Sequence, residues 1–174
     1  MTDLRYPIGE FEPPAEVTPE DLESWLGEIE ALPQALRAAV AGLPDEQLDT
    51  RYRPGGWTLR QVIHHLPDSH LNGYLRFKWA LTEHEPTIKT YDEVGAAGLA
   101  DYRTVPVETS VDFLELLHRK WILLLRALTP EQWARCFIHP DLGKLDLATT
   151  AALYAWHGRH HLAHITTTIE RLGW

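Results

Sequence analysis

An apolar stripe with the three- and four-residue spacing of an amphipathic helix runs through residues 59–83 and strongly constrains the fold. Thr58, followed three residues later by Gln61, forms a capping box that begins this helix. No segment shows the two-residue alternation of a strand bounded by turns. We therefore expect an all-α protein. The stripe consists of Leu59, Val62, Ile63, Leu66, Tyr74, Phe77 and Leu81.

Three further long helices are predicted. One begins at Thr18-Pro19 and runs to about residue 42, with Pro33 expected to kink or split it. A Leu-rich helix covers about 109–127, and Asp146 caps a last helix over 147–172 that stops at Gly173. Residues 129–132 begin a short helical turn, and a loop with a proline and a glycine follows it. The two halves of the chain repeat the order of long helix, short turn, loop and His-bearing helix, which favours a four-helix bundle.

Two segments fall outside these helices. Residues 1–16 contain three prolines and several acidic groups, and are predicted to form an extended N-terminal arm. Within it, Tyr6-Pro7-Ile8-Gly9 is expected to pack across the bundle or a partner subunit. Residues 84–107 lack clear periodicity and predict one long crossover loop, a place where function is often found.

Composition excludes several classes of protein. The 174 residues, 1–174, are expected to form a single domain with a sizeable core. A net charge of −9 argues against nucleic acid as a partner, because phosphate contacts need clustered Lys and Arg. No apolar run approaches about 18 residues, so no membrane partner is expected. The N-terminus does not resemble a secretory signal, and the single cysteine, Cys136, fits a reducing cytoplasm. Cys136 is not expected to be a nucleophile.

Seven of the ten histidines lie in two short segments about ninety residues apart, which predicts a metal site. On the last helix, His157 and His161 are an i, i+4 pair near the apolar arc, and two such imidazoles can share one metal ion. His160 and His164 form a competing pair that faces more toward solvent, and the spacing alone leaves both pairs open. The seven are His64, His65, His70, His157, His160, His161 and His164.

The first histidine segment does not single out a ligand. His70 lies on the apolar stripe and is most simply a hydrogen-bonded core residue. His64 and His65 flank the stripe on its two sides. Pro67 can bend the helix here, so periodicity alone does not choose the third ligand.

Four segments carry a resemblance to a known family: YPIGEF, GGWTLRQVIHHLPDSH, RFKWALTE with PTIK after it, and YAWHGRHHLAHI. They resemble the DinB-like family of four-helix metal proteins, and within it the YfiT-type metal-dependent hydrolases. The resemblance implies one ligand in a His-Leu-x-Asp context, which here is His65, and an i, i+4 pair that best matches His157 and His161. It also implies a homodimer. His64, His160 and His164 are then expected at the surface or in supporting roles.

Three neutral histidines with an open coordination position suit one divalent metal ion per chain, most readily Zn²⁺ and alternatively Ni²⁺. Such an ion can activate water, and the resemblance implies that the protein is a metal-dependent hydrolase acting on a small molecule. The resemblance also allows a metal-dependent thiol S-transferase that uses a low-molecular-weight thiol such as bacillithiol or mycothiol. The third hypothesis is a non-catalytic metal-binding stress protein. Asp68, one turn from His65, is a candidate acceptor for the second ring nitrogen of a ligand.

Overall fold

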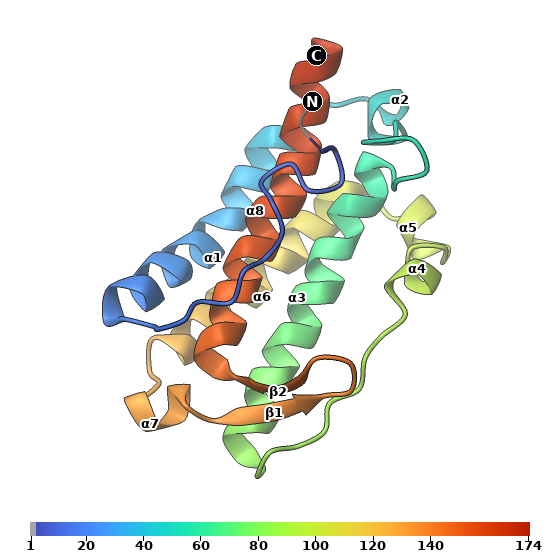
Figure 1. Ribbon diagram of the computed structural model, residues 1–174. Coiled ribbons are helices and arrows are strands. Elements are labelled where there is room, and N and C mark those ends of the chain that lie inside the picture. Colours follow the sequence, from blue (N-terminus) through green and yellow to red (C-terminus); the bar gives the residue numbers. More distant parts are fainter. Residues whose placement is uncertain (1–2) are drawn as a thin grey trace.

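The computed structural model describes residues 3–174 and contains four long helices. They are α1 (Pro19–Val40), α3 (Leu59–Thr82), α6 (Val107–Leu125) and α8 (Leu147–Leu172). Helix α1 packs against α6 and α8, and α3 packs against the same two helices, so the four close into a bundle (Figure 1). The predicted four-helix bundle is confirmed.

The shorter elements belong to the segments that connect the long helices. They include four single-turn helices, α2 (Asp45–Leu48), α4 (Glu93–Ala96), α5 (Asp101–Thr104) and α7 (Pro130–Trp133). Strands β1 (Cys136–His139) and β2 (Gly143–Asp146) form an antiparallel hairpin where the sequence predicted a loop, so the expectation of no strand was wrong. Strands of four residues are too short for a two-residue pattern to show in the sequence.

Proline does not interrupt the long helices. Pro33 lies inside α1 and Pro67 inside α3, and both helices continue through them. The predicted split at Pro33 was therefore wrong. Both prolines are buried, and packing in the bundle holds the helix although each proline lacks an amide donor.

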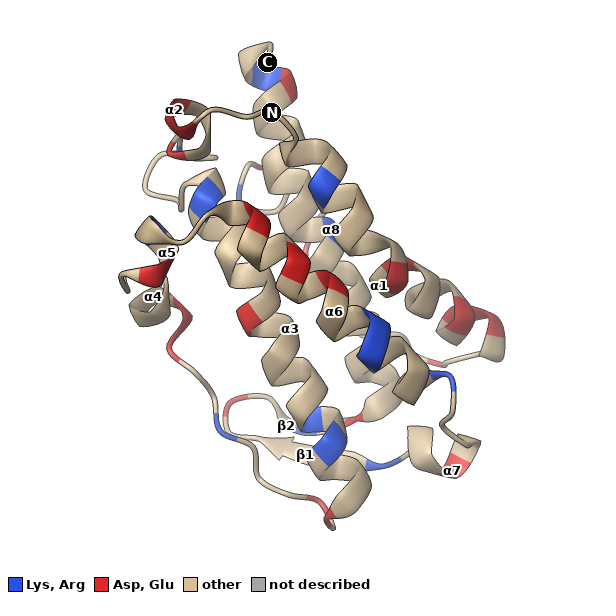
Figure 2. Ribbon diagram, turned by 180° about the vertical axis from the view of Figure 1, so that it is seen from behind, with Lys and Arg blue, Asp and Glu red and all other residues tan. Residues whose placement is uncertain are grey.

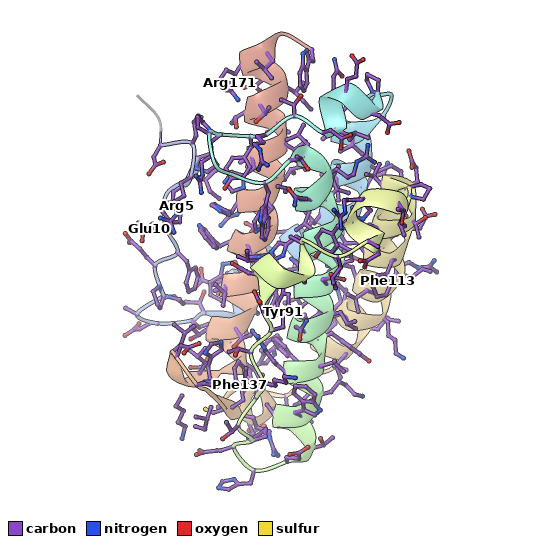
Figure 3. All side chains as sticks on the ribbon, turned by 90° about the vertical axis from the view of Figure 1, so that its right-hand side faces the viewer. Arg5, Glu10, Tyr91, Phe113, Phe137 and Arg171 are labelled. Atoms are coloured by element: carbon purple, nitrogen blue, oxygen red, sulfur yellow. The ribbon has the colours of Figure 1, made fainter. Side chains whose placement is uncertain are left out.

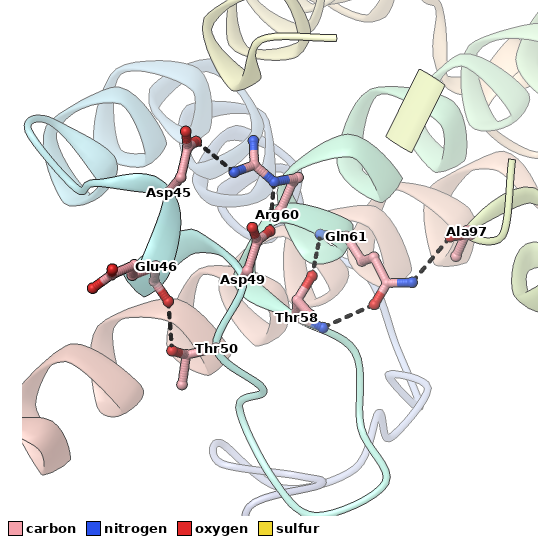
Figure 4. Close-up of polar contacts among 8 residues, drawn as sticks. All are labelled: Asp45, Glu46, Asp49, Thr50, Thr58, Arg60, Gln61 and Ala97. Atoms are coloured by element: carbon pink, nitrogen blue, oxygen red, sulfur yellow. Dashed lines mark hydrogen bonds and ion pairs between the residues drawn. The ribbon is translucent and has the colours of Figure 1, made fainter. Parts of the chain in front are cut away.

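Hydrogen bonds fix the first turn of helix α3, and the histidines of α3 follow directly after this turn. The Gln61 amide group accepts from the Thr58 backbone, and the Thr58 hydroxyl accepts from the Gln61 backbone, as the capping box predicts. The Gln61 side chain also donates to the carbonyl of Ala97, which attaches the crossover loop to α3 (Figure 4). Arg60 forms ion pairs with Asp45 and Asp49 of the α2 region (Figure 4).

The interior consists of two apolar clusters with a polar layer between them. One cluster contains Ile29, Phe77, Trp121 and Tyr154, and the other contains Leu32, Leu66, Leu114 and Ile165. On each long helix the sequence passes from one cluster to the other. Histidines of α3, α6 and α8 lie at this transition, so the candidate site is enclosed on two sides by apolar packing.

The N-terminal arm lies along α8, as Figures 1 and 3 show, and Met1 and Thr2 of the predicted arm lie outside the described residues. The Tyr6 ring lies 5.8 Å from that of His160, and Phe11 lies 5.9 Å from Trp156, centroid to centroid. The arm thus packs across the bundle and covers the helix face that was expected to meet solvent. His160 and His164 are 7% and 2% exposed, so that expectation was wrong.

Charged residues lie on the outside of the bundle. Figure 2 shows the bundle from the side opposite to Figure 1. On this side Lys and Arg are interspersed with Asp and Glu, and acidic residues follow one another along α6. Ion pairs join α1 to α6, from Arg37 to Asp112 and Glu115 and from Arg126 to Glu23 and Glu30. None of the helices formed by residues 3–174 has the length and apolar character needed to cross a membrane.

Candidate metal centre

The structure brings His65 of α3 together with His157 and His161 of α8. One ring nitrogen of each lies within 4.8 Å of the others. The two Nε2 atoms of His65 and His157 are 3.3 Å apart. Two nitrogens bound to a tetrahedral zinc ion at about 2.0–2.1 Å lie about 3.3–3.4 Å from each other, so this spacing fits a shared ion.

A second group of histidines lies next to the first. His160, His161 and His164 also have ring nitrogens within 4.8 Å of one another, and His161 belongs to both groups. The alternative ligand pair that the spacing left open is therefore also gathered in space. Proximity alone does not choose between the two groups, but the hydrogen bonds of His157, His161 and His164 show where the protons of these three rings lie.

The proton position on His157 follows from a chain of three buried imidazoles. The Ile29 carbonyl can only accept, so Nδ1 of His118, 2.6 Å away, carries a proton. Nε2 of neutral His118 then accepts from Nδ1 of His70 at 2.9 Å. Nε2 of His70 in turn accepts from Nδ1 of His157 at 3.2 Å. Nε2 of His157, which faces Nε2 of His65 and the Ser69 hydroxyl, therefore carries the lone pair.

A shorter chain fixes the proton on His161. The Arg5 carbonyl accepts from Nε2 of His164 at 3.0 Å, so Nδ1 of His164 has the lone pair. This Nδ1 lies 3.3 Å from Nδ1 of His161 and accepts its proton. His161 is therefore also left with a lone pair on Nε2. Because His164 uses its lone pair in this bond, in this arrangement it orients the His161 ring and has no lone pair left for a metal ion.

His65 has its second contact with a tyrosine that the sequence did not single out. The Tyr91 hydroxyl lies 3.1 Å from Nδ1 of His65 and comes from the crossover loop, where Figure 3 shows it between α3 and α8. Asp68 was the candidate for this role, but the structure does not place it against a ring nitrogen of His65. The Asp68 carboxylate accepts from the Tyr102 hydroxyl at 2.7 Å instead. The only signal in the sequence was the length of the crossover loop, because loops of this length often have a function. It did not single out Tyr91.

Burial keeps the histidines neutral. Loss of solvation lowers the pKa of His65 to about 4 and the pKa of His157 and His161 well below the usual value, and neighbouring histidines add to each effect. The pKa of His118 is also lowered by burial, to about 4. Neutral imidazole is the form that binds a metal ion, so the site needs no proton release near pH 7.

Aromatic and hydroxyl groups surround the three rings. The Trp57 ring centroid lies 4.8 Å from that of His65 and 6.5 Å from that of His161. The Ser69 hydroxyl lies 3.4 Å from Nε2 of His157. His70 has no exposed surface and is the hydrogen-bonded core residue that was predicted. His64 is buried and hydrogen-bonded to Ser110 on α6, so it lies inside the bundle and joins two of its helices.

The chain is similar to proteins that are described as metal-dependent enzymes. A "putative metal-dependent hydrolase" of Bacillus cereus (strain AH820) is 52% identical over 174 residues, the full length of both chains. A relative from Bacillus mycoides (strain KBAB4) with the same description is 51% identical over the same length. The solved structure of YfiT from Bacillus subtilis, described as "a probable metal-dependent hydrolase with an unusual four-helix bundle topology", has a TM-score of 0.96 and 46% identity, and 98% of each chain is covered.

A more distant solved structure, TT2238, shares only the fold, with 20% identity and a TM-score of 0.56 over 81% of this chain and 94% of that one. The sequence profile of the DinB superfamily matches residues 28–165. The predicted family resemblance is thus confirmed. The chain belongs to the DinB superfamily and is a protein of the YfiT type.

Proposed function

We propose that this protein is a hydrolase of small-molecule substrates that binds one divalent metal ion through Nε2 of His65, His157 and His161. The observation that carries the proposal is the convergence of lone pairs. His157 and His161 each donate from Nδ1 to another histidine, which leaves Nε2 unprotonated. When the Tyr91 hydroxyl accepts from Nδ1 of His65, Nε2 of His65 also carries a lone pair, and a cation bound between it and Nε2 of His157, 3.3 Å away, removes the repulsion of the two lone pairs.

The donor set favours a transition metal. Imidazole nitrogens suit Zn²⁺, our first choice, and also Ni²⁺. When bound, an ion with three neutral ligands acts as a Lewis acid and lowers the pKa of water from about 15.7 toward about 7. The names of the relatives support hydrolysis as the reaction class.

Residues of the chain would prepare the site for this chemistry. Trp57 packs on His65 and limits access of bulk water from that side. The Ser69 hydroxyl, beside Nε2 of His157, can hold a water molecule or a substrate oxygen by a hydrogen bond. Tyr91 fixes the orientation of the His65 ring.

Metal-dependent turnover of a panel of carboxylic esters and amides tests the proposal. The metal-free protein, the Zn²⁺-loaded protein and the Ni²⁺-loaded protein are compared, each with and without a low-molecular-weight thiol. We expect hydrolysis that needs metal but no thiol, that is lost in His65→Ala, and that is retained in His84→Ala, an exposed control. Turnover only with the thiol would replace hydrolysis by thiol transfer, and bound metal without any turnover would indicate a non-catalytic role.

A further inference from the structure

We propose that the cavity beside the candidate metal centre contains an anion-binding subsite, in which Arg76 and His139 bind a carboxylate or phosphate group of the substrate. This inference rests on the proposed function. The reacting group of the substrate lies at the histidines, and the subsite binds the group at the opposite end of the same molecule. The substrate class is then an acyl compound with an oxyanionic group at its other end.

The cavity joins the two parts of this proposed substrate site. Its volume is about 290 Å³, and it is bounded by α3, the crossover loop, the β1–β2 hairpin and α8. Three of its lining residues, Ser69, Tyr91 and His157, are also in contact with the candidate centre. A molecule in this cavity therefore meets the centre at one end. The lining residues are Ser69, Arg76, Thr90, Tyr91, Glu93, His139, Asp141, Leu153, Tyr154 and His157.

Arg76 reaches the cavity with donors to spare. Within residues 3–174, Arg76 forms no ion pair, so no carboxylate of the protein uses its donors. One Nη of Arg76 donates to the Tyr154 hydroxyl at 3.3 Å. Its Nε is buried and has no hydrogen-bond partner in the described structure. A buried guanidinium donor without an acceptor is unfavourable, and a small shift of the Arg76 side chain toward a bound oxyanion would give Nε and the second Nη an acceptor in the fork geometry of the guanidinium.

His139 supplies a second donor by an independent constraint. The backbone amides of Asp141 and Leu142 both donate to Nδ1 of His139, at 3.1 and 3.3 Å. A ring nitrogen that accepts has no proton, so neutral His139 carries its proton on Nε2. The tight turn of the hairpin therefore presents this side chain as an N–H donor. Burial and the nearby charge of Arg76 lower the pKa of His139 and favour this neutral form.

The acidic residues of the cavity wall do not cancel the preference of the cavity for an anion. Glu93 and Asp141 are exposed, so water and salt screen their charges. Arg76 and His139 are partly buried, where a charge or an N–H dipole acts more strongly on a bound group. The carboxylates lie where the cavity meets solvent, and they would disfavour a second anion there.

Calorimetric titration with two-headed probes tests the subsite. The Zn²⁺-loaded protein is titrated with monohydroxamates of malonic, succinic, glutaric and adipic acid, with the phosphonates of equal length, and with the matching methyl esters. The hydroxamate binds metal in every probe, so the comparison isolates the other end. We expect at least one acid to bind about tenfold or more tightly than its ester, and the better of carboxylate and phosphonate identifies the group.

Variants separate the subsite from general charge effects. We expect Arg76→Gln to abolish the advantage of the acid, Arg76→Lys to keep part of it, and His139→Phe to reduce it. Arg103→Gln should leave the advantage unchanged, because Arg103 is exposed and donates to the Gly98 carbonyl outside this cavity. Equal affinity of acid and ester at every length, or an advantage that survives Arg76→Gln, would overturn the subsite alone. If no probe binds, the metal centre itself fails, and the subsite with it.

Discussion

Nε2 of His118 lies 2.9 Å from Nδ1 of His70, and this contact joins α6 to α3 in the middle of the bundle. Neither residue is a candidate metal ligand. Through His70 the contact determines which nitrogen of His157 carries the proton. A residue on α6 thus leaves a nitrogen on α8 without a proton, which is the state that the proposed metal ligand requires.

We expect His118→Leu to lower metal affinity, because without an acceptor for its Nδ1 proton His70 can turn or take the other tautomer. Loss of a partner that orients a ligand weakens metal binding about 10- to 100-fold. Competition with a chromogenic chelator measures this affinity. His84→Leu changes an exposed histidine and should leave it unchanged. Equal affinities in both variants would show that the His118 contact only stabilises the fold.

Removal of residues 1–13 is expected to weaken metal binding as well. The deletion takes away the Arg5 carbonyl that accepts from His164, and water replaces it only in part. We expect a smaller decrease than for His118→Leu, below about tenfold. Affinity measured for the shortened protein and for His164→Ala should fall in the same direction. An unchanged affinity in the shortened protein would separate the arm from the metal site.

Acid should destabilise the metal-free protein. In the unfolded chain His65 and His118 take up protons below their usual pKa of about 6.5, whereas in the folded protein burial lowers the pKa of each to about 4. The unfolded state therefore binds more protons between these pH values, and the free energy of unfolding falls as pH decreases from 6.5 to 4. For His118 alone the loss approaches about 3 kcal/mol. Urea unfolding at pH 7, 5.5 and 4 measures it, and a flat profile would contradict buried neutral histidines.

Gly73 marks a close approach between α3, α6 and α8. A Cβ atom there would lie 2.4 Å from Cζ of Tyr154 and 2.8 Å from Cη2 of Trp121, and both rings are buried. We expect Gly73→Ala to decrease the free energy of unfolding by about 1–3 kcal/mol. Gly27→Ala is the matched control, since apart from the adjoining residues and the backbone of its own helix no atom lies within 4 Å of its Cβ position. That change in α1 should increase stability by about 0.5–1 kcal/mol. Similar effects of both changes would contradict the packing described.

The long helices could be predicted because their signals are local. The capping box at Thr58 and Gln61 and the cap at Asp146 both appear in the structure where the sequence placed them. The hairpin of β1 and β2 could not be predicted in this way. It is held partly by a distant segment, as Ile88 donates to the Ile138 carbonyl and Ile138 donates to the Pro86 carbonyl.

The site was predictable only in part. The i, i+4 spacing indicated His157 and His161 as candidate ligands, and the family resemblance added His65. The role of all three as ligands stays a prediction. Helix geometry alone suggested that His160 and His164 face solvent, but the N-terminal arm covers them. Tyr91 was missed because its position depends on the path of the crossover loop, which local sequence does not determine.

The central claim is most directly tested by metal content, measured by mass spectrometry on untagged protein refilled with Zn²⁺ or Ni²⁺. We predict about one ion per chain in the parent, in His160→Ala and in His164→Ala at saturating metal, and loss of the ion in His65→Ala, His157→Ala and His161→Ala. Metal retained without His65 or His157 but lost without His160 and His164 would place the ion in the second histidine group. Absence of metal from every sample would contradict the metal centre altogether.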